Sequence, residues 1–148
     1  MRAFHYSFQK VLDLKSNTKR QSEWYLAQAV GKLQAAEQSL HALQQERQSS
    51  AESLQDIVGH STSAQELQRI QQYQDYLDEQ ILIADSNVKS AEDHVKLQQH
   101  ELEEKMKDEK VWTKAKEKAE AIYKQGIAVA EQYEMDEMAT VRYHMASR

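Results

Sequence analysis

The residue types that usually carry chemistry are sparse in this chain and stand far apart along it. The sequence has no cysteine, no glycine-rich phosphate loop and no histidine pair spaced for a metal. His100 and Glu104, four residues apart, could touch on a helix, and we interpret them as a plain surface contact. We therefore expect a protein that is not an enzyme, with no catalytic residue, no cofactor and no metal. The scattered histidines are His5, His41, His60, His94, His100 and His144.

The elements that must position any functional side chain are long helices. None of the 148 residues is proline, and only Gly31, Gly59 and Gly126 are glycine. Proline breaks helices, so its absence permits very long ones. Gly59 stands in a run of small and polar residues, where a left-handed glycine would end one helix and a hydroxyl would cap the next. We predict one helix over about 4–58, a turn over about 59–63 and a second helix over about 64–142.

Apolar residues recur at alternating steps of three and four, which is the heptad seam of a coiled coil. The second stretch has its own start signal, because Ser63 followed by Glu66 forms a capping box. The first stretch is broken by Arg47 and Ser50, and the second by Gln74 and Gln98. The first seam comprises Leu26, Ala29, Leu33, Ala36, Leu40, Leu43, Leu54 and Ile57; the second comprises Leu67, Ile70, Leu77, Ile81, Ala84, Val88, Ala91, Val95 and Leu102.

Two apolar stripes joined by a short turn bury each other only when their helices lie antiparallel. The predicted fold class is therefore all-α, a single antiparallel coiled-coil hairpin over residues 1–148 whose second helix is longer. Around a turn near residue 61, residue i faces about residue 122 minus i, which sets Phe8 near Trp112 to Lys114. The residues after about 118 then form an overhang without a partner.

Two groups of apolar residues fall outside this seam and are candidates for docking. Tyr73 and Tyr76 should flank Leu77, with Gln80 following, and remain partly accessible; they either cover the seam or bind a partner. The overhang carries unpaired apolar residues, which favour an enclosing partner or self-association. These residues are Ile127, Val129, Tyr133, Met135, Met138, Val141, Tyr143 and Met145.

Charge and hydropathy exclude several classes of function. The formal net charge is −5, which argues against nucleic-acid binding, since that needs a concentrated basic face. The lysines from Lys105 to Lys118 alternate with acidic residues and read as a solvated helix face, with Glu101–Lys105 and Glu103–Lys107 as favourable pairs. No stretch approaches the roughly 20 apolar residues of a membrane span, and the N-terminus lacks the apolar core of a signal peptide. We expect a cytoplasmic protein.

The order of these features resembles one family. The opening Phe8-Gln9-Lys10-Val11-Leu12-Asp13-Leu14-Lys15, the seam, the Tyr73-x-x-x-Leu77 step and the late Met135-Asp136-Glu137-Met138-Ala139 are similar to the flagellar export protein FliJ. The resemblance implies a stalk-like component of the bacterial flagellar type III export apparatus, at the flagellar base. It implies three partners: the hexameric export ATPase, the cytoplasmic part of the export-gate membrane protein, and export chaperones.

The resemblance also gives each end of the hairpin an expected role. The terminal end would enter the ATPase ring through Phe8, Val11, Leu12, Ile127, Tyr133, Met135 and Met138. The region near the turn would contact the gate through Tyr73, Tyr76, Leu77 and Gln80. Two other functions stay open: a self-associating coiled coil that tethers other components, and the equivalent stalk of a virulence secretion system.

Overall fold

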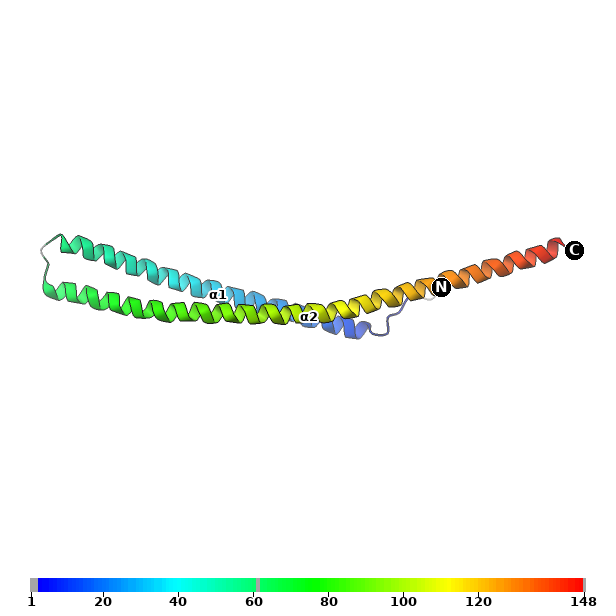
Figure 1. Cartoon of the computed structure of the whole chain (residues 1–148), viewed down its shortest axis with the longest axis horizontal. Helices are drawn as coiled ribbons and strands as arrows, with labels where there is room; N and C mark the ends of the chain where they lie inside the picture. The colour runs from blue at the N-terminus through cyan, green and yellow to red at the C-terminus, as the bar shows by residue number, and fades with distance from the viewer. Residues whose placement is uncertain (1–2, 61, 148) are drawn as a thin grey trace. The chain divides into compact units, whose positions relative to one another are not determined.

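Two long α-helices make up nearly all of the structure (Figure 1). The computed structural model describes residues 3–60 and 62–147. Helix α1 spans Gln9–Val58 and helix α2 spans Ala64–Ala146, so they contain 50 and 83 residues. The two helices pack side by side and antiparallel, and α2 is the longer. The expected fold class is confirmed, and no strand is present in the residues just given.

Helix α1 begins later than the sequence pattern indicates. We expected a start near residue 4, whereas the first helical residue is Gln9, whose backbone N–H donates to the Tyr6 carbonyl at 3.1 Å. The reason is that the Tyr6 side chain is buried, with 8% exposed, and its ring meets that of Phe8 edge-on. A continuous helix would move these rings away from each other, so tertiary packing overrides the helical pattern here.

The turn also differs in detail from expectation. Gly59 does not adopt the expected left-handed backbone conformation, and none of the described residues has a positive φ. The end of α1 is closed instead by His60, whose backbone N–H donates to the Ile57 carbonyl and whose Nδ1 lies 3.0 Å from the Asp56 carbonyl. These contacts satisfy carbonyl groups that a helix end otherwise leaves without partners.

The start of α2 carries half of the expected capping box. The backbone N–H of Glu66 donates to the Ser63 hydroxyl at 3.2 Å, as expected for an N-cap. The Glu66 carboxylate, however, accepts a hydrogen bond at 2.8 Å from the Thr62 hydroxyl. The Glu66 carboxylate therefore bonds to the Thr62 hydroxyl instead of accepting the Ser63 backbone N–H, as it would in a complete capping box.

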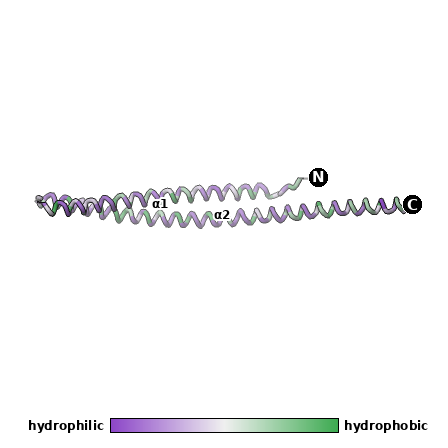
Figure 2. Tube along the Cα trace, turned by 90° about the horizontal axis from the view of Figure 1, so that it is seen from above, coloured by the Kyte–Doolittle hydropathy of each residue, from purple (hydrophilic) through white to green (hydrophobic). Residues whose placement is uncertain are grey.

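The chain divides into two compact units, which we name by their position along the hairpin. The turn unit is Gln21–Glu103, and the terminal unit combines Met1–Arg20 with Glu104–Arg148. Each unit contains a stretch of both helices. Hydrophobic and hydrophilic residues alternate in short bands along the tube of each helix (Figure 2), as a narrow seam with a wet outer surface requires.

The seam of the turn unit follows the heptads. All the seam residues named from the sequence between Leu26 and Leu102 are buried or half-buried. The most enclosed are Ala29 and Leu77, each with 2% exposed, and Ala84, Val88 and Val95 are also buried. Polar residues share the seam: Ser22 and Gln74 are buried, and the Arg47 guanidinium binds Asp78 at 2.7 Å. A turn near residue 61 sets Arg47 opposite residue 75, so its partner Asp78 lies about one helical turn further along α2.

The terminal unit is held by aromatic and ionic contacts. Leu12 is its buried aliphatic residue, and the Phe8 ring lies 5.7 Å from the Trp112 ring, as expected. Phe4 meets Tyr123 at 5.5 Å, so the N-terminal segment covers α2 beyond residue 118, where we expected no partner. From residue 128 to residue 147 every side chain is exposed. No helix in the described part of the chain is both long and apolar enough to cross a membrane.

Candidate partner-binding surfaces

The first surface is an aromatic patch on α2 in the turn unit, made of Tyr73, Tyr76 and Gln80. Tyr73 and Tyr76 are 42% and 54% exposed, and their rings stack with centroids 6.4 Å apart. Leu77, which the sequence grouped with them, points into the seam with only 2% exposed. A partner can touch the tyrosines directly, whereas Leu77 acts by holding the helix face in place.

Tyr73 is further fixed by α1. Its hydroxyl donates a hydrogen bond of 2.9 Å to the Glu46 carboxylate. This bond favours the protonated phenol, so it raises the pKa of Tyr73 above the ordinary tyrosine value, with desolvation and the Glu46 charge adding to the effect. Tyr73 therefore presents a neutral phenol, hydrogen-bonded to Glu46, to a partner at physiological pH.

A shallow groove between the two helices adjoins the patch. Its walls are Tyr73 and Arg69 on one side and Glu46 with three serines, Ser49, Ser50 and Ser53, on the other. From the sequence, Ser50 stood out only as a break in the first seam, and Glu46, Ser49 and Ser53 were typical of the solvent-facing positions of a heptad repeat. The antiparallel register sets Tyr73 opposite about residue 49, and this is the signal that could have identified the α1 side of the groove.

The second surface lies where α1 begins, in the terminal unit. Phe8 is 52% exposed despite its contact with Trp112, Val11 is half-buried and Leu12 is buried. Phe8 and Val11 are thus accessible to a partner, while Leu12 supports them from the seam. Leu14, which belongs to the same opening motif, is 61% exposed and lies outside this packing.

Ion pairs tie α1 to α2 next to this cluster. Lys19 Nζ lies 3.1 Å from Glu109 Oε1, and Lys15 Nζ lies 3.7 Å from Asp108 Oδ2. Hydrogen bonds from Ser16 and then Lys19 lower the pKa of the Glu109 carboxyl below its ordinary value. Polar and charged side chains here replace the apolar seam residues of the turn unit.

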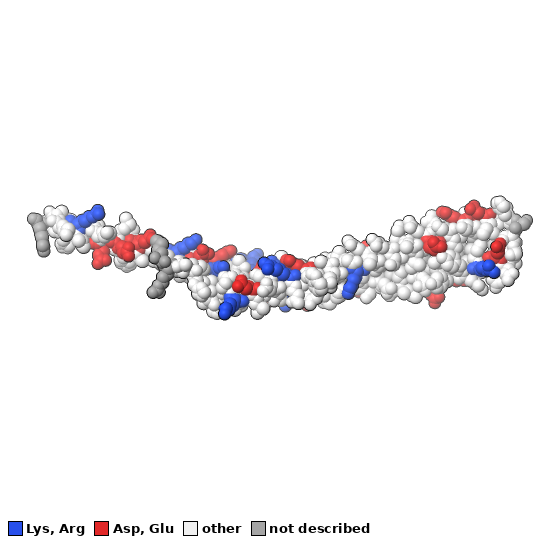
Figure 3. All heavy atoms as spheres, turned by 180° about the vertical axis from the view of Figure 1, so that it is seen from behind, with Lys and Arg blue, Asp and Glu red and all other residues white. Residues whose placement is uncertain are grey.

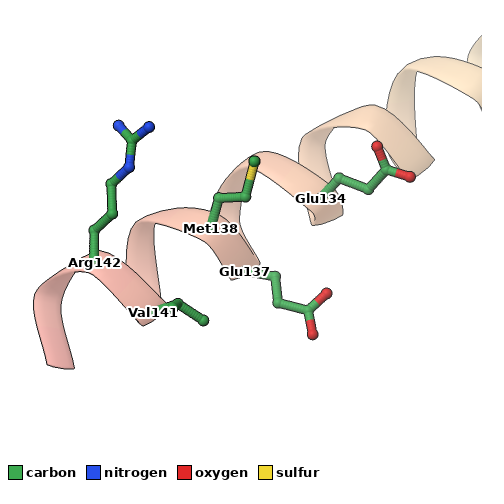
Figure 4. A pocket seen from close by; sticks show the side chains of 5 residues that line it. All are labelled: Glu134, Glu137, Met138, Val141 and Arg142. Carbon is green, nitrogen blue, oxygen red and sulfur yellow. The ribbon is translucent and has the colours of Figure 1, made fainter. Parts of the chain in front are cut away.

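The third surface is the overhang of α2, from residue 124 onward. Tyr133, Met135 and Met138 are 72%, 66% and 62% exposed, and Ile127 is half-buried. Figure 4 shows the hollow in this segment, where Met138 and Arg142 extend to one side of the helix and Glu137 and Val141 to the other. All its lining residues, which also include Glu134, come from α2 alone. A hollow on one helix cannot enclose a substrate, but it can be covered by another protein.

Charge is unevenly divided between the two units. The turn unit carries fourteen acidic and five basic residues, a formal charge of −9, whereas the terminal unit carries ten acidic and fourteen basic residues, a formal charge of +4. On the face in Figure 3, Lys and Arg atoms gather over the helix-paired part of the terminal unit, and a group of Asp and Glu atoms lies on the overhang. No group of three potential metal-binding side chains occurs among residues 3–60 and 62–147.

A sequence model of the family described as flagellar FliJ protein matches residues 4–148. The chain belongs to the flagellar FliJ protein family. The resemblance carried by the opening motif, the seam and the late methionines is thereby confirmed. Membership in the FliJ family makes this chain a stalk-type, structural component of type III protein export.

A solved structure shares the fold of this FliJ-family chain. It is a putative YscO homolog from Chlamydia trachomatis, with a TM-score of 0.67, 18% sequence identity, and 98% of each chain covered. The likeness extends to both helices, since almost the whole of each chain is aligned. The chain has no significant match among curated protein sequences.

Proposed function

We propose that this chain acts as the stalk of a flagellar type III export apparatus, engaging the export ATPase ring with its terminal unit and contacting the export gate through the aromatic patch. The single observation that carries the proposal is the overhang. In a family of export components, a helix that continues past its partner with exposed tyrosine and methionine side chains provides a surface for a surrounding protein ring.

The terminal unit has the properties that insertion into a ring requires. Its seam ends at the Phe4–Tyr123 contact, and beyond that point Tyr133, Met135 and Met138 are free to meet other chains. Methionine is flexible and polarisable, so it adapts to subunits that present different contacts around a ring. Phe8 and Val11 add an accessible apolar surface on α1, and Leu12 supports it.

The aromatic patch is the surface we assign to the export gate, the cytoplasmic part of a membrane protein. Exposed tyrosines bury a large apolar area with little loss of side-chain freedom and keep a polar hydroxyl, which is why tyrosine is common at binding hot spots. Tyr76 is exposed and free to be covered, Gln80 is half-buried beside it, and Tyr73 is held in place by Glu46. Such a patch, on the same chain as the overhang, would couple the ATPase to the gate.

The protein would then work in the cytoplasm at the base of the flagellum, and the nucleotide chemistry would belong to its partner. An escort role for export chaperones would use the remaining exposed surface of the turn unit. The main competing function is a tether that self-associates through its overhang. The exposed apolar residues from Val129 to Met145 suit either occupant.

The first test is the steady-state rate of ATP hydrolysis by the cognate flagellar export ATPase, with and without this protein, together with the fraction of ATPase assembled into hexamers. We expect the rate and the hexamer fraction to rise together. The variant Tyr133→Ala/Met138→Ala should lose most of this stimulation. The matched control is Leu82→Ala/Leu97→Ala, because these side chains are 72% and 54% exposed and lie in the turn unit.

Equal loss in the control variant would contradict the assignment of the overhang to the ring. No stimulation at saturating protein, together with a concentration-dependent rise in molecular mass of the protein alone, would favour the tether. The gate assignment is tested separately by binding of Tyr76→Ala to the purified cytoplasmic part of the gate, with Tyr25→Ala, 44% exposed in the wild type, as the control. Tyr76→Ala should weaken this binding and leave ATPase stimulation unchanged.

A further inference from the structure

Four lysines form a ridge on the outer side of α2 in the terminal unit. Lys107, Lys110, Lys114 and Lys118 are all exposed. At about 100° of rotation per residue they fall within a sector of about 80°, so they form one stripe along the helix. The face that packs on the N-terminal segment carries Glu109, Trp112 and Tyr123, which lie on roughly the opposite side of α2. We call the four residues the lysine ridge.

The ridge is not neutralised within the chain. Lys107 has one weak pair with Glu104 at 3.8 Å, while Lys110, Lys114 and Lys118 form no ion pair within residues 3–60 and 62–147. The sequence suggested a solvated face with Glu101–Lys105 and Glu103–Lys107 pairs, but neither pair forms among those residues. Two lysine pairs on the ridge, 110 with 114 and 114 with 118, have the spacing at which like charges repel and destabilise a helix.

Apolar side chains run beside the ridge. Val111, Ile122 and Val129 are 65%, 61% and 49% exposed and lie along one line of the helix, because they are separated by eleven and seven residues. This line borders the stripe of Lys114 and Lys118. The combined surface is a narrow apolar line with cations along one edge, about 33 Å long from residue 107 to residue 129.

We propose that the lysine ridge is the docking site for an acidic amphipathic helix of another protein, which packs its apolar seam on Val111, Ile122 and Val129. An apolar line with charges of one sign along its edge is a pattern by which one helix selects another of opposite charge. A membrane surface fits less well, because interfacial helices present a broad apolar face rich in large residues. The acidic side chains of the incoming helix would neutralise these lysines and so remove their mutual repulsion.

This site shares Val129 with the overhang and otherwise differs from the surfaces assigned above. The ring contacts use Tyr133, Met135 and Met138 of the overhang and the start of α1, and the gate contact uses the turn unit. The lysine ridge, Val111 and Ile122 instead lie along the paired part of α2, on the side away from α1. The proposal does not depend on ATPase stimulation, so either can fail without the other.

The test places a photo-crosslinking amino acid, benzoylphenylalanine, at position 111 or 122 of the full chain in cells that carry it as the sole copy. The control position is 82, where Leu82 is 72% exposed in the turn unit. The protein segment attached to the probe is then identified by mass spectrometry. We expect a net acidic segment of another protein, with apolar residues at helical spacing, captured at 111 and 122 and not at 82.

The charge dependence is tested with Lys110→Gln/Lys114→Gln/Lys118→Gln, which should lower the crosslink yield about tenfold. The matched control, Lys32→Gln/Lys89→Gln/Lys96→Gln, removes the same charge from exposed sites in the turn unit and should leave the yield unchanged. The ridge variant should melt close to the wild-type temperature, because the three substituted lysines are exposed and form no ion pair among the described residues. A captured lipid, a second copy of this chain, a neutral or basic segment, no adduct above the control, or an unchanged yield would overturn the proposal.

Discussion

Replacing Leu77 with alanine tests whether Leu77 stabilises the fold as a buried seam residue or belongs to the exposed aromatic patch of α2. Leu77 is 2% exposed, so the substitution removes three carbon atoms from a buried position. At about 0.8 kcal/mol per buried carbon the transfer loss is about 2.4 kcal/mol. The remaining cavity adds little, since two helices can close a gap more easily than a globular core. We expect a total loss of about 2.5 to 3.5 kcal/mol in the free energy of unfolding.

The assay is urea and thermal unfolding followed by far-ultraviolet circular dichroism, with Tyr76→Ala as the companion variant. For a chain of this size the expected loss lowers the melting temperature by about 5 to 14 °C. Tyr76→Ala, whose side chain is 54% exposed in the wild type, should change the stability by less than about 1 kcal/mol. Similar losses in both variants would refute the division into a buried Leu77 and an exposed patch. Only after this measurement can a binding defect of Leu77→Ala be interpreted.

Three further predictions concern single residues. Gly31→Ala should stabilise the protein by about 0.5 to 1 kcal/mol in urea unfolding, because an added Cβ meets nothing within 4 Å and alanine favours a helix; a loss would show that Gly31 has a backbone role. Gln74→Leu should raise the melting temperature, because the buried Nε2 has no hydrogen-bond partner among the described residues; a lower melting temperature or a change in oligomeric state would show that Gln74 maintains the register. Glu109→Gln should lower the stability most at neutral pH and progressively less as the solution is acidified. The folded state lowers the pKa of this carboxyl below 4.5, its value in the unfolded chain. The carboxylate therefore stabilises the fold above pH 4.5, and this contribution is lost as the pH falls through the folded pKa. Melting temperatures of both proteins between neutral pH and about pH 3 check the sign, and a constant difference would contradict it.

The helical hairpin could be predicted from local features of the sequence. The absence of proline, the seven-residue spacing and the small residues around Gly59 act over a few turns of helix at a time. They determine which face of each helix is apolar, and the short turn then brings the two faces together. The exposed tyrosines beside Leu77 and the uncovered apolar overhang follow from the same periodicity.

Contacts between residues far apart in the sequence decided where α1 begins and how much of α2 is covered. Tyr6 and Phe4 fold the N-terminal segment onto α2, which shortens α1 and extends the covered part of α2 to Tyr123. The closure of α1 by His60 is instead local, since its contacts reach only Ile57 and Asp56 and Gly59 keeps an ordinary backbone conformation.

The lysines near residue 110 show the limit of reasoning from sequence spacing alone. Their alternation with acidic residues suggested mutual neutralisation, but only the packed structure determines which acids are engaged elsewhere. Glu109 turns inward to Lys19 and Asp108 reaches Lys15 on α1. By itself the sequence determined the helices, their pairing and their apolar faces. The tertiary structure alone decided which charges pair between the two helices. Lys19 and Glu109, for example, lie ninety residues apart in the chain and meet only in the fold.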